Sequence, residues 1–365
     1  MNSPLHYQIA LTLLPDIGAI TAKKLVAYCG GVEAIFKESS RSLGKIPGIN
    51  KRVINSIKNH QEMKLAEREV EFIIKNNIQA IFFLDDNYPN RLKHCADSPL
   101  LLYFKGNVNF NAQQVLSVVG TRQASEYGLE ICENILSEFS GSDTLIVSGL
   151  AYGIDTCSHR AALKYHLPTV GVLGHGLDRI YPQQNKKYAD QMQENGGILT
   201  EFRQGTIPDR VNFPQRNRIV AGMADATLVV ESKKRGGSLI TAHLAFDYNR
   251  DVLAIPGRPA DINSIGCNYL IQKNIAQLIN SADDIKKLLN WEKETVIGTT
   301  QKQLFVDLND NERIILDNME INKNNAIDTI SIESGLSMSK TAAILLSLEF
   351  KGLVKTLPGK RYKLI

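Results

Sequence analysis

The chain has 365 residues, a length that suggests two or three domains. Its 43% hydrophobic and 22% charged residues are typical of a globular protein, and no apolar run approaches the ~20 residues that a membrane span needs. Five scattered cysteines without a CxxC pair argue against a disulfide framework or a zinc ribbon, and the net charge of +4 permits a polyanionic partner without demanding one. With no basic signal-peptide region at the start, these features predict a cytoplasmic protein without a membrane segment.

Residues 1–78 are predicted to form a module of short helices. Two stretches, Leu14 to Gly30 and Leu43 to Ile57, look alike, because each has an apolar–x–x–Gly turn followed by a helix. They resemble tandem helix-hairpin-helix units. Gly18 and Gly48 allow a positive φ, which would let backbone N–H groups at a helix start face a phosphate. The alternative stays open that these turns only connect the helices of a small bundle.

From residue 79 to 290 the pattern changes to strands that alternate with helices. Continuous apolar runs rich in Val, Ile and Leu are typical of strands buried on both faces, and six such runs occur: 115–120, 144–149, 169–174, 197–202, 226–232 and 251–257. Two earlier runs, 80–84 and 101–106, are predicted to extend the same sheet. The sequence thus predicts an α/β fold with a doubly wound, mostly parallel sheet of the extended Rossmann type.

The C-terminal part is predicted to be a separate domain. Residues 291–310 are polar and indicate a linker; residues 311–365 contain three helical stretches and a hairpin that turns at Pro358-Gly359, the arrangement of a winged helix. The third helix, residues 338–350, is largely apolar, so a duplex reader is not indicated. The basic residues gather in the wing, at Lys351, Lys355, Lys360, Arg361 and Lys363. Our hypothesis is that this domain is mainly a partner or regulatory module with at most a few phosphate contacts.

Ligands of an open parallel sheet bind beyond the carboxyl ends of the strands, against helix N-termini. Four strand-to-helix turns are rich in glycine, and none matches a dinucleotide fingerprint or a P-loop. A row of such turns suits a chain of phosphates. The predicted contacts are Gly120, Thr121 and Arg122 in the first turn, Ser148, Gly149 and Gly153 in the second, Gly174 and Gly176 in the third, and Gly237, Ser238 and Thr241 in the fourth. Alternatively, these glycines only let helices pack closely on the strands.

The segment from Phe202 to Gly222 is basic, with four arginines opposed only by Asp209. Phe213 lies among them. Basic groups follow a backbone and an aromatic face stacks a base, which is how single strands are held without sequence readout. The residues predicted to bind DNA here are Phe213, Arg216, Asn217 and Arg218. Outside this segment, Lys186, which follows YPQQN, is a weaker candidate for a phosphate contact. The alternatives are that Phe213 belongs to the core and that the arginines are solvated or paired with carboxylates.

Between about Ser117 and Asp284 these motifs occur in a fixed order: GTR, SGLAYGID, TVGVLGHGLDRIYP, NFPQRNRIVAG and GSLITA. In this order and spacing the chain resembles the DNA-processing protein A (DprA/Smf) family, with Thr121 where the family has the serine of GSR. The resemblance implies binding of single-stranded DNA, a homodimer formed through the central domain, and loading of RecA recombinase onto incoming DNA in natural transformation. It implies no cofactor.

Enzymatic interpretations are less well supported. The seven histidines are scattered, so no metal site is expected, and Ser148 lacks the GxSxG spacing of a nucleophile elbow. Nucleotide phosphoribohydrolases have a similar sheet, but residues 234–242 lack the acidic position of their PGGxGTxxE motif. We therefore expect no enzymatic activity, with such a hydrolase as the alternative.

Three residues near the turns carry more local expectations. We expect Arg122 to open the first helix of the sheet, where its guanidinium can fork onto a phosphate. Asp155 suits an N-cap after Gly153, and Glu201 suits an ion pair with a neighbouring arginine.

Overall fold

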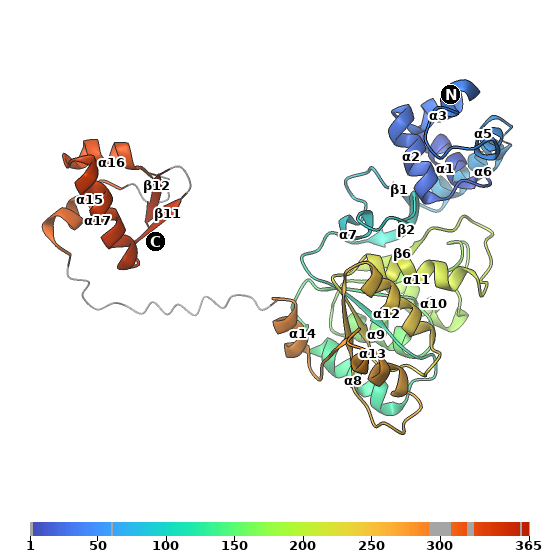
Figure 1. Cartoon of the computed structure of the whole chain (residues 1–365). Helices are drawn as coiled ribbons and strands as arrows, with labels where there is room; N and C mark the ends of the chain where they lie inside the picture. The colour runs from blue at the N-terminus through green and yellow to red at the C-terminus, as the bar shows by residue number, and fades with distance from the viewer. Residues whose placement is uncertain (1–2, 60, 292–307, 320–324, 358–359, 365) are drawn as a thin grey trace. The chain divides into compact units, whose positions relative to one another are not determined.

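The computed structural model describes residues 3–59, 61–291, 308–319, 325–357 and 360–364 (Figure 1). The chain divides into two compact units, Met1–Glu292 and Lys293–Ile365. Each unit has an apolar core of its own. The boundaries predicted at 78/79 and 290/291 remain predictions. Within the described part of the chain, no helix is both long and apolar enough to cross a membrane.

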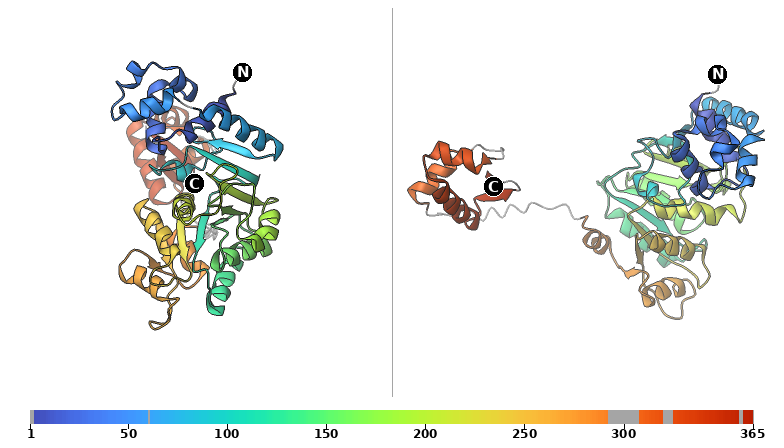
Figure 2. Two further views of the ribbon diagram at one scale, coloured as in Figure 1. Left: turned by 90° about the vertical axis from the view of Figure 1, so that its right-hand side faces the viewer. Right: turned by 45° about the horizontal axis from the view of Figure 1, so that its top comes forward.

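The first unit begins with six helices: α1 (Pro4–Leu13), α2 (Ala19–Cys29), α3 (Val32–Lys37), α4 (Ser40–Leu43), α5 (Lys51–Lys58) and α6 (Glu62–Lys75). Their apolar faces share a core that continues into the sheet through Phe82, Leu101 and Tyr103. The views agree that these helices lie at the β1–β2 end of the sheet (Figure 2). The helical module and the sheet therefore pack as one body.

The two similar stretches of the helical module contact each other reciprocally. The Ser56 hydroxyl of α5 donates to the carbonyl of Pro15 in the first turn (2.6 Å), and the Lys24 ammonium of α2 donates to the carbonyl of Pro47 in the second (2.5 Å). Gly48 has a φ of 81°, as predicted. The positive φ predicted for Gly18 is wrong, because this residue is the extended N-cap of α2 with a φ of −76°.

A nine-stranded sheet forms the centre of this unit, in the order β1-β2-β6-β5-β4-β3-β7-β8-β9. The strands are β1 (Gln79–Phe82), β2 (Leu101–Asn107), β3 (Val115–Val119), β4 (Leu145–Ser148), β5 (Thr169–Val172), β6 (Gly196–Thr200), β7 (Ala226–Val229), β8 (Asp251–Ala254) and β9 (Gln277–Leu278). Strand β2 runs antiparallel to β1 and β6, and the remaining pairs are parallel. The predicted mostly parallel α/β sheet is confirmed; β9 is a strand that the sequence did not indicate.

Alternate residues of β3, β4, β7 and β8 enter two different cores, because side chains of a strand point to opposite faces. In β3, for example, Val115 and Val119 enter one core, and Leu116 and Val118 enter the other. The first face is covered by α7 (Asn90–Lys93), α11 (Asn212–Gly222), α12 (Gly237–Asp247) and α13 (Ile265–Gln272). The second is covered by α8 (Glu126–Ser137), α9 (Ile154–Lys164) and α14 (Ala282–Leu288). Burial on both faces explains why these strands are continuously apolar.

The chain order creates a topological switch point. From β3 the chain proceeds through β4 and β5 to β6, with the 3-10 helix η1 (Gln183–Asn185) and α10 (Lys186–Gln191) before β6. It then returns to the other side of β3 and continues through β7, β8 and β9. The switch point therefore lies between β3 and β7, which is where an open α/β sheet places its ligand.

The second unit contains α15 (Asp310–Asp317), β10 (Asn325–Ala326), α16 (Ile327–Ser334), α17 (Met338–Phe350), β11 (Val354–Leu357) and β12 (Arg361–Leu364). Its sheet has the order β10-β12-β11. Three helices and a hairpin around one apolar core confirm the predicted winged helix. The turn predicted at Pro358-Gly359 and most of the predicted linker lie outside the described residues.

Candidate nucleic-acid interface

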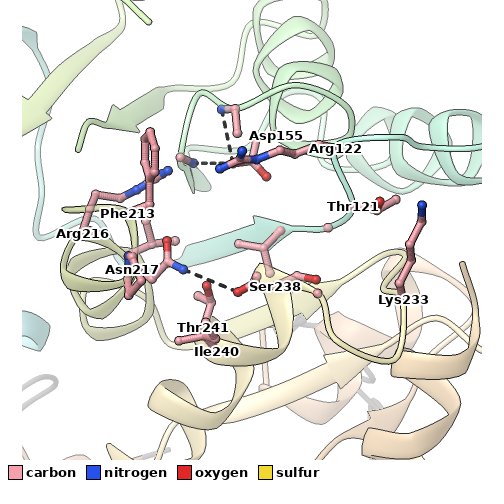
Figure 3. Close-up of a pocket in the computed structure, with 18 of the residues that line it drawn as sticks. Thr121, Arg122, Asp155, Phe213, Arg216, Asn217, Lys233, Ser238, Ile240 and Thr241 are labelled. Carbon is pink, nitrogen blue, oxygen red and sulfur yellow. Dashed lines mark hydrogen bonds between the residues drawn. The ribbon is translucent and has the colours of Figure 1, made fainter. Parts of the chain in front are cut away.

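A cavity of about 470 Å³ lies at the carboxyl ends of β3, β4 and β7, at the switch point (Figure 3). Its walls are the turns after β3 and β4, the first turns of α11, and the loop from β7 into α12. The side chains that line it include five cations, Arg122, Arg210, Arg216, Lys233 and Arg235, and one carboxylate, Asp155. This excess of positive charge suits an anionic ligand.

The turn after β3 is held on both sides by backbone hydrogen bonds. Thr121 N–H donates to the carbonyl of Glu231 (2.8 Å), and the Thr121 carbonyl accepts from Ile154 N–H (3.2 Å). A Cβ at Gly120 would lie 2.5 Å from the Ile154 side chain, and one at Gly153 would lie 2.2 Å from the Thr121 carbonyl. Glycine is therefore required for this turn to pack against the start of α9.

Arg122 is exposed at the rim of the cavity. Its guanidinium carbon lies 5.3 Å from the centroid of the Phe213 ring, within the range of a cation–π contact. The expectation that Arg122 opens a helix is wrong: α8 begins at Glu126, and the Ser125 hydroxyl caps it by accepting from Gly128 N–H (3.1 Å). Arg122 thus belongs to the loop before that helix and reaches over the aromatic wall.

The turn after β4 is already bound to a protein carboxylate. Asp155 Oδ2 accepts from Gly149 N–H (3.2 Å) and from Ala151 N–H (3.4 Å) (Figure 3). Gly153 is the N-cap of α9, so Asp155 lies in its first turn and is not the predicted cap. Burial raises the pKa of the Asp155 carboxyl, and the neighbouring arginine Arg216 opposes that rise. The two N–H groups are therefore not available to a phosphate.

Arg216 forms the buried floor of the cavity, with 4% of its surface exposed. A Cβ at Gly149 would lie 1.5 Å from Arg216 Nη1, so only glycine leaves room for this guanidinium. Burial lowers the pKa of Arg216 to about 10, Asp155 acts in the opposite direction, and Arg122 lowers it further. The guanidinium remains charged at neutral pH, yet its Nε has no hydrogen-bond partner among the described residues. A buried charge without an ion-pair partner is costly, and this guanidinium lines the cavity, so the cavity suits an anion.

The loop from β7 brings a helix start to the cavity. Gly236 is the N-cap of α12, which has 11 residues and no side-chain cap. Asn217 Nδ2 lies 3.5 Å from the Gly237 carbonyl and ties α11 to this loop (Figure 3). The Ser238 hydroxyl is buried and donates to Ser232 Oγ (2.9 Å). The N-terminus of α12 therefore adds a partial positive charge to that of the arginines.

The structure brings ten of the predicted residues together around this cavity: Gly120, Thr121, Arg122, Gly149, Phe213, Arg216, Asn217, Gly237, Ser238 and Thr241. It does not bring six others to it: Ser148, Gly153, Gly174, Gly176, Lys186 and Arg218. Three of the four glycine-rich turns thus meet at the switch point. The turn after β5 does not line the cavity.

The Ser148 hydroxyl, which was predicted to bind phosphate, does not face the cavity. It is fully buried and donates to the carbonyl of Val118 on the neighbouring strand (2.6 Å). The glycines of the turn after β5 serve packing instead. A Cβ at Gly174 would lie 3.0 Å from the Phe213 ring, and one at Gly176 would lie 2.4 Å from a backbone carbonyl. The alternative interpretation, close packing, therefore holds for this turn.

Lys186 and Arg218 point to other parts of the unit. Lys186 is the first residue of α10 and lines a separate cavity of about 440 Å³. Arg218 forms an ion pair with Glu201, the partnership expected for that glutamate, and also donates to the carbonyl of Asp97 (2.6 Å). Neither side chain lines the switch-point cavity, so the prediction that places them in the site is corrected.

Three cations of the cavity were missing from the predicted set. Lys233 and Arg235 belong to the run Lys-Lys-Arg directly before the glycine pair of the fourth turn, and that run was the available signal. Lys233 Nζ donates to Gln123 Oε1 of the first turn (2.7 Å). Arg210 comes from the basic segment before Phe213. The charge of the site thus comes from three separate parts of the chain.

Residues 79–290 match the family model described as DNA recombination-mediator protein A, and residues 302–360 match the DprA winged helix domain. Protein Smf of Synechocystis sp. is 31% identical, with 99% of each chain covered. DNA processing protein DprA of Streptococcus pneumoniae is 42% identical over 55% of this chain and 71% of its own length.

Two solved structures are also similar. The X-ray structure of DNA processing protein A from Streptococcus pneumoniae has a TM-score of 0.67 at 32% identity and covers 79% of this chain and 98% of its own. The protein from Helicobacter pylori, whose structure concerns its single-stranded DNA binding mode, has a TM-score of 0.53 at 26% identity and covers 59% and 96%. The family match spans more than half of the chain, and the Synechocystis relative covers 99% of it. The chain therefore belongs to the DNA recombination-mediator protein A (DprA/Smf) family.

Proposed function

We propose that this protein is a single-stranded DNA-binding recombination mediator that holds the strand in the switch-point cavity. The observation that carries the proposal is the buried Arg216 guanidinium, which lines the cavity and forms no ion pair among the described residues. Four more cations line the same cavity, and the one carboxylate there is engaged by backbone N–H groups. A phosphodiester in the cavity accepts hydrogen bonds from the cations of its walls and neutralises their charge.

The arrangement favours a single strand over a duplex. Phe213 and Ile240 add apolar surface to the cavity, and a base reaches such surface only when it is unpaired. Arg122 lies over the same ring, so one wall offers both a cation and a stacking face. The proposed DNA contacts are Gly120, Thr121, Arg122, Phe213, Arg216, Asn217, Gly237, Ser238 and Thr241, together with Arg210, Lys233 and Arg235.

The relatives support the same class of function. The Helicobacter pylori protein is described by its single-stranded DNA binding mode, and the family is named for recombination mediation. Loading of RecA recombinase during natural transformation, a homodimer through the central domain and a cytoplasmic location complete the proposal. These last parts rest on the family resemblance and the composition.

We further propose that the protein is not an enzyme. The carboxylate of the cavity and two that follow β6 and β7 are engaged in structure: Asp155 by two N–H groups, Glu201 by Arg218, and Glu231 by Ser125. Incubation with nucleoside monophosphates should therefore release no free base. Release of base that is abolished in Asp155→Asn or Glu201→Gln would instead support the phosphoribohydrolase alternative.

A titration of short single strands and matched duplexes at two salt concentrations tests the proposed binding. We expect tighter binding to the single strand, and affinity that falls with added salt, because phosphate contacts release counterions. Equal affinity for both substrates, or affinity independent of salt, would contradict a cavity that holds phosphates and stacks unpaired bases.

A further inference from the structure

Glu231 is a buried carboxylate that bonds to the segment after β3. It follows β7, and only 1% of its surface is exposed. Among the described residues, no ion pair involves it. Its Oε2 accepts from Ser125 N–H (2.9 Å), and its Oε1 accepts from the Ser125 hydroxyl (2.5 Å). Burial of a carboxylate without a cation is costly unless hydrogen bonds satisfy its oxygens, so these two residues hold each other in place.

Glu231 bonds to both ends of the loop that carries Arg122. At one end, its backbone carbonyl accepts from Thr121 N–H (2.8 Å). At the other end, its carboxylate accepts from Ser125, the N-cap of α8. Arg122 lies between these two anchors, with its side chain exposed at the rim of the cavity. One residue thus fixes both ends of the segment 121–125, which we call the Arg122 loop.

The start of α8 is built around the same carboxylate. The Ser125 hydroxyl that donates to Glu231 also accepts from Gly128 N–H (3.1 Å). A Cβ at Gly128 would lie 2.4 Å from the carboxyl carbon of Glu231 and 2.4 Å from its Oε2. The carboxylate therefore fills the space that a side chain at this position would take, near the positive end of the helix dipole. A methyl group at residue 128 would displace it without altering any residue that lines the cavity.

An ordered loop makes the exposed arginine a better ligand for a phosphate. Ordering a mobile loop on binding costs conformational entropy, and a loop that is already ordered in the free protein avoids this cost. Both ends of the Arg122 loop are held by Glu231, which does not itself line the cavity. We propose that Glu231 is a positioning residue for Arg122, which raises the affinity for a single strand without contacting it. The inference rests on the proposed function, because it requires a strand in the cavity.

The experiment measures the single-strand affinity of the full chain by fluorescence anisotropy, with each variant made in the native chain and in the Arg122→Ala chain. Glu231→Leu removes both acceptor oxygens at a similar volume, and Glu231→Gln keeps one oxygen for Ser125 N–H. Gly128→Ala displaces the carboxylate but leaves it in the chain. It also provides the test where Glu231→Leu does not fold, because alanine favours a helix more than glycine does. Glu130→Gln is the matched control, since Glu130 is an exposed carboxylate of the same helix.

In the native chain, we expect Glu231→Leu and Gly128→Ala to weaken binding several-fold, by no more than Arg122→Ala does. Glu231→Gln should weaken it less, and Glu130→Gln should leave it unchanged. In the Arg122→Ala chain, the same substitutions should have no further effect, because the side chain that they position is gone. Hydrogen exchange of the backbone amides in residues 121–125 should rise in Glu231→Leu and Gly128→Ala, and not in the control.

Equal weakening in the two backgrounds would overturn the inference, because Glu231 would then support the fold of the cavity and not the position of Arg122. Native affinity in both Glu231→Leu and Gly128→Ala would overturn it as well. In either case Arg122→Ala alone still weakens binding, so the proposed function stands. If Arg122→Ala alone binds as the native chain does, the proposed role of Arg122 in the site fails, and the inference fails with it.

Discussion

Arg122 and Arg216 line the same cavity, but their different burial gives them different roles. Arg216 is enclosed by Gly149 and faces Asp155, so its position is fixed before any ligand arrives. Arg122 is exposed and rests on Phe213. A fixed cation sets where a phosphate is held, and an exposed one adds a contact at the rim. Substitution of Arg122 should therefore change binding without disturbing the fold.

We expect Arg122→Ala to weaken single-strand binding by one phosphate contact, which lowers the salt slope by about 0.7. The measurement is a titration at four salt concentrations. Arg160→Ala is the matched control, since Arg160 lies on α9 away from the cavity and pairs with Glu133 (3.3 Å). An affinity and slope equal to those of the control would remove Arg122 from the site.

His159 makes the stability of the first unit depend on pH. Its Nδ1 lies 2.7 Å from Thr169 Oγ1, the ring is fully buried, and burial lowers its pKa to about 3. The folded state keeps this ring neutral, while the unfolded state takes up a proton below about pH 6.5. The stabilisation is therefore complete above pH 6.5 and is lost progressively as the pH falls toward 3.

The loss amounts to roughly 1.4 kcal/mol for each pH unit, or about 2 kcal/mol at pH 5. Urea denaturation at pH 7 and pH 5 measures it. His159→Gln, which does not titrate, should be less stable at pH 7 but lose clearly less on acidification. A variant with the same pH dependence as the native chain would show that other groups cause the effect.

At the scale of the elements, the strands were predictable and the roles of the turns only in part. A strand buried on both faces has one reason to be apolar, so each predicted run contains a strand. A glycine after a strand can make room for a ligand or for another part of the chain, and the sequence does not distinguish the two cases. Gly149 makes room for the Arg216 side chain, and Gly176 makes room for a backbone carbonyl. The prediction for Ser148 failed for a similar reason. Its hydroxyl needs an acceptor, and the carbonyl of Val118 provides one in place of a phosphate.

The joint between α2 and the sheet is a second feature that only the structure shows. Lys23 Nζ donates to Ser98 Oγ (2.5 Å), and the adjacent Asp97 carbonyl accepts from Arg218 of α11 (2.6 Å). The loop around Asp97 therefore lies between the helical module and the helix that carries Phe213 and Arg216. Burial lowers the pKa of Lys23, which agrees with its position in this joint.

We expect Lys23→Met to destabilise the first unit by about 1 kcal/mol through loss of this charged hydrogen bond. Hydrogen exchange should rise in residues 95–98 and at the start of α2. Lys24→Met is the control, because Lys24 bonds to Pro47 within the helical module. Equal exchange in 95–98 for the two variants would mean that Lys23 does not hold the joint.

At the scale of the whole molecule, the proposed single-strand site belongs to the first unit alone. The cavity lies entirely within the first unit, and the winged helix has its own core and its own cations. A chain that ends near Trp291 should therefore keep most of its affinity for short single strands at moderate salt. Anisotropy titrations of the truncated and full chains test this. A truncated chain that stays folded but loses most of its binding would move the main site to the winged helix.

The position of the Asp155 carboxylate affects how the affinity for a DNA strand depends on its length. Because it takes the donors of the turn after β4, and the turn after β5 only packs, the sheet edge offers one anion cradle in place of a row. One anion site binds one short stretch of DNA, so nucleotides beyond that stretch add little to the affinity for a single copy of the protein. Strength on longer DNA must come from valency: a second copy, held nearby by the proposed dimer, meets the same strand at high effective concentration. Affinity across a ladder of oligonucleotide lengths should therefore rise in a step, at the length that first spans two cavities.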